Sequence, residues 1–178
     1  TTGGNNVAVG YRALSENTTV SNLTAVGYEA LYSNTTGANN VALGYQALRA
    51  STTSWGNTAV GAGALSAHTI GSSRNTAIGY IALAANTTGA ANTAVGGHAL
   101  QSNTTGHSNS AMGFSSMSTM TTGTYNTSLG YMSLFSGTTG GANVALGANS
   151  MTSSTSGQTN TAVGSYSLQS GTTAGANV

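Results

Sequence analysis

The sequence contains no proline, cysteine, lysine or aspartate, and only 3% of its 178 residues are charged. Without cysteine no disulfide forms, an absence that fits any cellular compartment. The charged residues give a formal net charge of +1 and are Arg12, Glu16, Glu29, Arg49 and Arg74. Such a chain offers no basic patch for nucleic acid and no acidic face for cations. No apolar run approaches the roughly 20 residues that span a bilayer, so we expect no membrane insertion.

The chain instead repeats one short phrase, N-T-A-V-G-Y-x-A-L, followed by a segment like N-T-T-G. The glycine that closes N-T-A-V-G recurs every 17 residues, with one 18-residue copy at 61–78. The closing glycines are Gly10, Gly27, Gly44, Gly61, Gly79, Gly96, Gly113, Gly130, Gly147 and Gly164. Ten copies predict a single repeat array over residues 1–178, with the extra residue in the loop I-G-S-S-R-N. No signal peptide is visible and the first residue is not Met, so we expect a segment of a longer fibrous protein.

Alignment on the closing glycine gives chemically uniform columns. The residue before it is always aliphatic or Met: Val9, Val26, Leu43, Val60, Ile78, Val95, Met112, Leu129, Leu146 and Val163. A second column, four residues after it, consists of Leu14, Leu31, Leu48, Leu65, Leu83, Leu100, Met117, Leu134, Met151 and Leu168. Two residues before the glycine stands Ala, except at Ser128, and four before it stands Asn, except at Leu23. Disorder gives no reason to keep such a register, so a disordered linker is disfavoured.

These columns predict an all-β fold, a parallel β-solenoid of about ten coils. N-T-A-V-G reads as a short strand and Y-x-A-L-x as a second, with the glycine permitting a bend between them. N-T-T-G is turn chemistry, in which we expect Gly to supply positive φ. Stacked coils would place Val on Val and Leu on Leu, and the Asn column would form an amide ladder. At about 4.8 Å per coil the rod is on the order of 50 Å long.

The alanine column lies on the opposite side of the strand from the aliphatic residue before the glycine. Small residues there either allow a neighbouring chain to approach closely or fit a narrow interior, and we favour the chain contact. Low charge also favours association, because electrostatic repulsion between copies of such a rod is weak.

The phrase N-[TV]-A-[VIL]-G-x-x-[AS]-L resembles the head repeats of trimeric autotransporter adhesins (the YadA-like, Hep/Hag type) and similar arrays in phage tail fibres. The resemblance covers the whole chain. It implies a left-handed β-roll that assembles as a homotrimer and is displayed extracellularly for attachment to a host-surface receptor or glycan. The 17-residue coil is longer than is usual for the adhesin heads, and we place the extra residues in the N-T-T-G turn.

The sequence contains few residues suited to catalysis or metal binding, and we predict no enzymatic activity, no cofactor and no metal site. The only carboxylates, Glu16 and Glu29, occupy different positions in their copies and read as solvated surface charges. His68, His98 and His107 lack the spacing of zinc ligands. One metal arrangement stays open, with one histidine from each of three chains on a shared axis. Calcium-binding solenoids need Asp, and no Lys follows the glycines as in a phosphate loop.

Aromatic residues are the best candidates for ligand contact. After the closing glycine stand Tyr11, Tyr28, Tyr45, Tyr80, Phe114 and Tyr131. Such a column either stacks against sugar rings or, as we favour, shields the bend or a seam between chains. Trp55 occurs once, in a turn, and is the best single candidate for ligand contact.

Threonine pairs in the turns suggest a further, less favoured function. They form a rank along one edge that loosely resembles the Thr arrays of ice-binding solenoids, although Thr is ordinary in such turns. The pairs begin at Thr18, Thr35, Thr52, Thr87, Thr104, Thr121, Thr138 and Thr172.

Three functions therefore remain open. The first is a structural, adhesive region of an extracellular trimeric fibre, in a phage tail fibre or surface adhesin. The second is a self-polymerising filament, because the chain begins T-T-G-G-N-N-V and ends T-T-A-G-A-N-V without a distinct capping coil. The third is a monomeric ice- or glycan-binding solenoid. They predict a closed trimer, an open polymer and a monomer, respectively.

Overall fold

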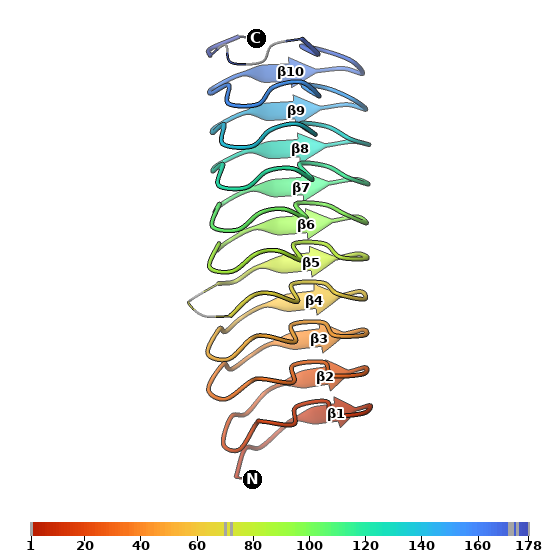
Figure 1. The fold of residues 1–178 in the computed structure, drawn as a ribbon, viewed down its shortest axis with the longest axis vertical. Helices are drawn as coiled ribbons and strands as arrows, with labels where there is room; N and C mark the ends of the chain where they lie inside the picture. Colours follow the sequence, from red (N-terminus) through yellow and green to blue (C-terminus); the bar gives the residue numbers. More distant parts are fainter. Residues whose placement is uncertain (1, 70, 72, 171–172, 174, 178) are drawn as a thin grey trace.

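The computed structural model describes residues 2–69, 71, 73–170, 173 and 175–177, and these form a rod of stacked coils (Figure 1). Each strand is three residues long and ends immediately before a closing glycine. The strands are β1 (Val7–Val9), β2 (Thr24–Val26), β3 (Val41–Leu43), β4 (Thr58–Val60), β5 (Thr76–Ile78), β6 (Thr93–Val95), β7 (Ser110–Met112), β8 (Thr127–Leu129), β9 (Val144–Leu146) and β10 (Thr161–Val163). The chain advances one coil at a time from one end of the rod to the other.

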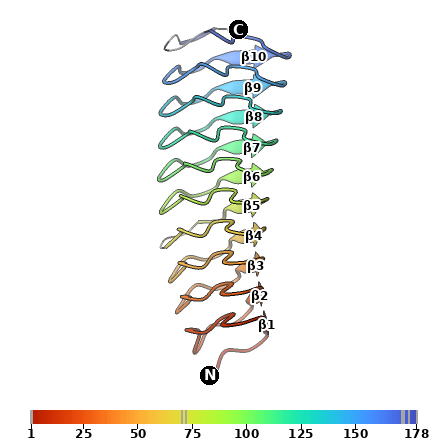
Figure 2. The ribbon, with the colours of Figure 1, turned by 45° about the vertical axis from the view of Figure 1, so that its right-hand side comes forward.

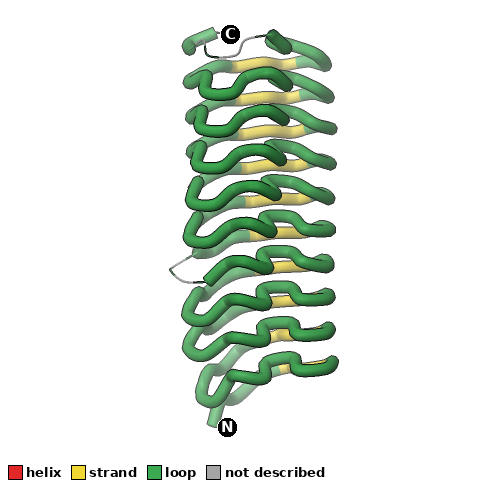
Figure 3. The backbone as a smooth tube through the Cα atoms, viewed as in Figure 1, coloured by secondary structure: helices red, strands yellow, loops and turns green. Residues whose placement is uncertain are grey.

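The ten strands form one parallel sheet in chain order, so each strand pairs with those of the adjacent coils. The register passes unbroken through the 18-residue copy, where Thr58 pairs with Thr76. Ile70 and Ser72, in the loop of that copy, lie outside the described residues. The strands stack along one side of the rod, and turns complete every coil (Figures 2 and 3). The predicted parallel β-solenoid is confirmed, and its left-handed winding and trimeric state stay predictions.

The predicted second strand, Y-x-A-L-x, is wrong, because these residues form successive turns. In the third coil, Ala47 N–H donates to Gly44 C=O at 3.4 Å and Arg49 N–H donates to Gln46 C=O at 3.3 Å. Gln46 and Leu48 have φ values of 53° and 50°, the left-handed region that the third residue of a type II turn adopts. The pattern of apolar residues does not reveal this, since neither position carries Gly or Asn.

Hydrogen bonds between coils hold these left-handed residues. Leu48 N–H donates to Ala64 C=O of the next coil at 3.0 Å, and Gln46 N–H donates to Tyr28 C=O of the preceding coil at 2.8 Å. Left-handed φ costs an L-residue roughly 1–2 kcal/mol. Leaving a buried N–H without a partner costs about 1–3 kcal/mol. The strained conformation therefore persists because the neighbouring coils supply the partners.

The interior of each coil is narrow and is lined by alanine and leucine. The middle residue of the strand, such as Ala42 or Ala94, is fully buried and belongs to the same core cluster as the leucine column. Leu48 and Leu83 of that column are also 0% exposed. The alanine column thus fits a narrow interior, and the favoured prediction of a chain contact through it is wrong.

The aliphatic residue before the glycine stacks in register but points out of the coil. Val9 pairs with Val26, and Leu43 pairs with Val60. Because successive side chains of a strand point to opposite faces, burial of the alanine turns its neighbours outward. Leu43 is 44% exposed. This column therefore stacks in register as predicted, but it is surface rather than core.

The predicted asparagine ladder is confirmed. Oδ1 of Asn92 accepts the backbone N–H of Asn109 at 3.0 Å and its side-chain Nδ2 at 3.2 Å. Nδ2 of Asn109 also donates to Gly123 C=O, in a turn 14 residues later, at 2.8 Å. Asn109 thus bonds both to the neighbouring asparagine of its column and to a turn, and these bonds fix the position of the turn relative to the asparagine column.

Two glycine columns have different physical roles. The closing glycines have φ values from 117° to 140°, and a Cβ on Gly96 would lie 2.5 Å from the carbonyl oxygen of Gly113. The predicted bend at this glycine is confirmed. The prediction that the N-T-T-G glycine supplies positive φ is wrong. A Cβ on Gly106 would lie 2.4 Å from the carbonyl oxygen of Gly123 in the next coil. Close approach of the next coil therefore favours glycine there, although Val20 and Ser54 occupy the same position in two other coils.

We expect Gly96→Ala to destabilise the rod by about 3 kcal/mol or more, because strain at positive φ adds to a clash with backbone. Gly164→Ala separates the two effects, since φ is 117° but no described atom lies within 4 Å of the added Cβ. It should cost less than Gly96→Ala, about 1–3 kcal/mol, because only the backbone strain remains. Denaturant unfolding followed by circular dichroism measures both, and equal losses would contradict the role of close approach.

Candidate interaction surfaces

The outward face of the sheet is uncharged and combines a column rich in hydroxyl groups with an apolar column. Its first column, at the start of each strand, contains only Val, Thr and Ser. Its second column is the residue before the closing glycine, and exposed members include Val9 (57%), Leu43 (44%), Ile78 (40%), Met112 (46%), Leu129 (51%) and Val163 (69%). An exposed apolar column that continues along the rod indicates an interaction site. Sequence reasoning missed it, because alternation alone does not say which face is inside.

The aromatic residues after the glycine form an exposed column beside this face. Tyr11 and Tyr28 stack with ring centroids 5.3 Å apart, as do Tyr28 and Tyr45. Phe114 and Tyr131 stack at 6.0 Å. The structure thus brings the predicted Tyr11, Tyr28 and Tyr45 together, and Tyr28 has a ring against each of its faces. Contact with a ligand at these three positions stays a prediction.

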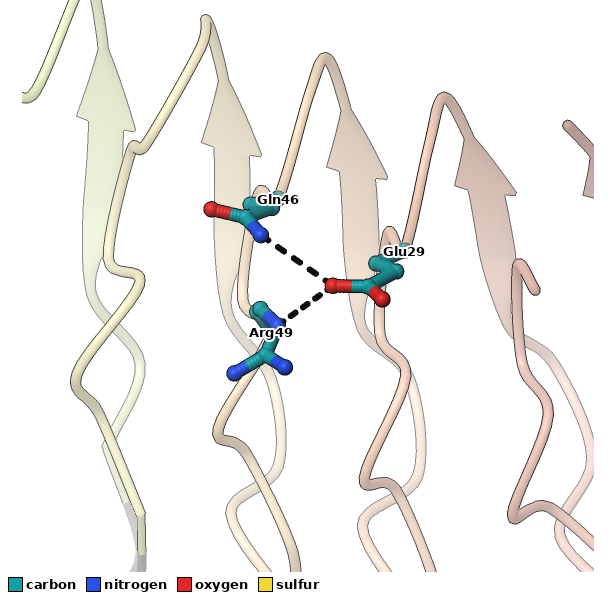
Figure 4. A network of polar contacts seen from close by, with 3 residues as sticks. All are labelled: Glu29, Gln46 and Arg49. Carbon is teal, nitrogen blue, oxygen red and sulfur yellow. Dashed lines mark hydrogen bonds and ion pairs between the residues drawn. The ribbon is translucent and has the colours of Figure 1, made fainter. Parts of the chain in front are cut away.

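Glu29 forms a polar network next to the aromatic column (Figure 4). Its Oε2 accepts from Arg49 Nε at 2.6 Å and from Gln46 Nε2 at 3.1 Å. The hydrogen bond from Arg49 is the main reason that the pKa of Glu29 is lowered. The Glu29 side chain is only 8% exposed. Glu29 is therefore a paired and largely buried carboxylate, not the solvated charge that was predicted, whereas Glu16 is exposed.

Trp55 lies at a turn edge and is 36% exposed. The guanidinium carbon of Arg74, from the next coil, lies 4.6 Å from the centroid of its ring. This cation–π contact occupies one face of the indole. The other parts of the ring remain available, and ligand contact at Trp55 stays a prediction.

The threonine pairs divide into a bonded and an exposed column. Oγ1 of the first threonine donates to the carbonyl of the next coil, as from Thr87 to Thr104 O and from Thr104 to Thr121 O, both at 3.1 Å. The second threonine, such as Thr105, is exposed. Thr172 lies outside the described residues. Hydroxyls of the first column thus connect coils and are not free to order water as an ice-binding rank would.

His68 is fully buried and belongs to an interior polar cluster. Its Nε2 lies 2.7 Å from Ser73 Oγ, and its Nδ1 lies 3.1 Å from Asn86 Nδ2, which donates to it. Burial lowers the pKa of His68 to about 4. The imidazole faces the interior, so it cannot ligate a metal on an axis shared between chains. Among the described residues, no three His, Cys, Asp or Glu side chains are grouped to hold a metal ion.

No enclosed pocket is found in the described part of the chain. Within the same residues no helix has the length and hydrophobicity to cross a membrane. Comparison with known proteins adds no relative, because no protein family, curated protein sequence or solved structure matches this chain.

We expect acid to destabilise the rod through His68. Its pKa is about 4 in the folded chain and about 6.5 in the unfolded chain, so the unfolded chain takes up the proton first. Stability present above about pH 6.5 is lost as the pH falls toward 4, and the full loss is on the order of 3 kcal/mol. Urea unfolding at a series of pH values measures it. The stability that Glu29 contributes through its lowered pKa is present above about pH 4.5 and is lost only below it, outside this pH range.

His68→Asn is the matched variant, because other coils carry Asn at this position, as at Asn34 and Asn86. We expect its stability to change little between about pH 6.5 and 4.5. The same pH slope in the variant and in the original chain would contradict the assignment to His68.

Proposed function

We propose that this chain forms the rod of an extracellular trimeric fibre, as in phage tail fibres or surface adhesins. The rod holds a receptor-binding surface away from the particle or cell that carries it. The observation that carries the proposal is the exposed apolar face of the sheet, which runs from Val9 to Val163. Monomeric soluble proteins rarely expose a contiguous apolar surface larger than a few hundred Å². Such a face fits a chain that is partnered along its length.

A second copy of the same chain is the partner that fits this face best. The two outward columns of the sheet contain no charged residue, so copies meet no electrostatic repulsion there. Every copy also has the same coil height, so side chains of one rod match the spacing of another. A strip about 15 Å wide along a rod of about 50 Å covers on the order of 700 Å². Stable pairwise interfaces bury roughly 800 Å² per partner, and two neighbours share the strip in a trimer, so the fibre needs further contacts beside it.

The trimer and the extracellular location rest on the resemblance of the repeat to adhesin heads and tail-fibre arrays. A mechanical role agrees with the direction of the bonding, because the backbone hydrogen bonds between coils run along the rod axis. Every coil boundary carries several of them, which share an axial load. The proposed role needs no catalytic residue, cofactor or metal.

We expect the chain to have a mass of three times 17.4 kDa in size-exclusion chromatography with light scattering, independent of concentration. Leu43→Glu combined with Leu129→Glu places charges in the apolar face and should give folded monomers. The matched control, Thr36→Glu with Thr122→Glu, adds the same charges at exposed turn positions and should remain trimeric.

A monomeric original chain would contradict the fibre proposal. A mass that grows with concentration would favour the self-polymerising filament instead. Equal dissociation of both double variants would show that added charge, and not its place on the apolar face, controls association.

A further inference from the structure

The exposed aromatic column is interrupted at Ala62, between Tyr45 of the preceding coil and Tyr80 of the following one. The next residue in this coil, Gly63, has no side chain to replace the missing ring. Cγ2 of Ile81 lies 3.0 Å from the position that a Cβ on Gly63 would take, so a methyl group borders the gap. Two exposed tyrosines thus stand on either side of a gap one coil high.

Other interruptions of the column are different. At Gly97 the imidazole of His98 fills the gap, edge-on to the rings of Tyr80 at 5.5 Å and Phe114 at 5.2 Å. After Ala148 the following coil has no aromatic residue at this position, so one wall is missing. Within the described residues, the gap at Ala62 therefore combines two aromatic walls with no ring between them.

The height of the gap suits a ring that is not flat. Tyr11 and Tyr28, in adjacent coils, are 5.3 Å apart, so Tyr45 and Tyr80, two coils apart, lie about 10 Å apart. A flat aromatic group held between two rings needs only about 7 Å, which is two contacts of 3.5 Å. A chair-shaped sugar ring is thicker and presents C–H groups on both faces. The spacing favours a sugar over a planar group.

The gap also leaves ring faces free. Tyr28 is covered on both faces by its stacked neighbours, whereas Tyr45 has a ring on one side only. Tyr45 is 54% exposed and Tyr80 is 59% exposed. The negative face of an aromatic ring attracts the positive edge of C–H groups. These two faces are therefore available to the C–H groups of a sugar.

Gln46 supplies a polar group at the edge of the gap. Its Nε2 donates to Glu29, and its amide oxygen points away from Glu29, toward the coil that contains Ala62 (Figure 4). This oxygen can accept a hydrogen bond from a hydroxyl group. The nearby charges of Glu29 and Arg49 bond to each other, so the gap favours an uncharged ligand.

We propose that Tyr45, Tyr80, Ala62 and Gln46 form a slot that binds one neutral hexopyranose unit of a glycan. The two tyrosine rings cover the faces of the sugar, and Gln46 accepts a hydrogen bond from one of its hydroxyls. The slot is open on its outer side, so it accommodates a unit within a longer saccharide. All of its residues belong to one chain, so it goes beyond the fibre proposal and does not depend on trimer formation.

Saturation-transfer difference NMR tests the slot, with cellotriose, mannotriose and triacetylchitotriose as probes at millimolar concentration. We expect transfer from tyrosine ring protons to the C–H protons of at least one probe. Ala62→Tyr fills the gap with the residue that the column has in other coils, and should weaken binding at least tenfold, or about 1.4 kcal/mol. Ala148→Tyr, the matched control, fills a gap with one wall and should leave binding unchanged.

Absence of transfer to all three probes would overturn the slot. Binding that survives Ala62→Tyr, or that is lost equally in Ala148→Tyr, would also overturn it. The molar mass of the same samples keeps the two proposals separate. A monomer that binds a probe supports the slot and contradicts the fibre. A trimer that binds no probe supports the fibre and contradicts the slot.

Discussion

Every coil of this rod depends on hydrogen bonds that its own residues cannot make. The interior is only about one alanine and one leucine wide, and much of the backbone bonds along the rod axis instead. Gly44 N–H donates to Val26 O of the preceding coil at 2.8 Å, and Leu48 N–H donates to Ala64 O of the next coil at 3.0 Å. Each coil therefore copies the conformation of its neighbours. A change of backbone conformation in one coil would leave donors unpaired in the coils on both sides, which is why the chain repeats nearly the same sequence.

This constraint fixes the inward positions and leaves the outward ones free to vary. The closing glycine recurs in every coil because a carbonyl of the next coil approaches it, and a small residue, alanine or Ser128, occupies the middle of the strand because the interior is narrow. Outward positions carry the departures from the repeat, such as Ala62 in the aromatic column, Trp55 at a turn, and the bonded pair of Glu29 and Arg49. The proposed binding slot is therefore built from exceptions to the repeat, whereas the proposed association between rods uses columns that recur in every coil.

The period, the parallel stacking, the asparagine ladder and the bend at the closing glycine could all be predicted, because each follows from a residue type that recurs at one position. The turns after the glycine could not. Gln46 and Leu48 adopt left-handed φ only because neighbouring coils bond to them, and their side chains give no signal of it. Alternation along the strand identified two faces, but not that alanine faces inward, since this depends on the width of the closed coil. The Glu29–Arg49 pair and the gap at Ala62 become visible only when positions in adjacent coils are read side by side.

Amide hydrogen exchange followed by NMR tests most directly whether bonding between coils continues through the turns. The leucine amides in left-handed conformation, Leu31, Leu48, Leu65, Leu83 and Leu100, each donate to the next coil at 3.0 Å. The account predicts that they exchange as slowly as the closing glycines Gly44, Gly61, Gly79 and Gly96, which donate to the preceding coil at 2.7 to 2.8 Å. Rapid exchange at the leucines beside slow exchange in the strands would contradict it, because only the sheet would then hold the coils together.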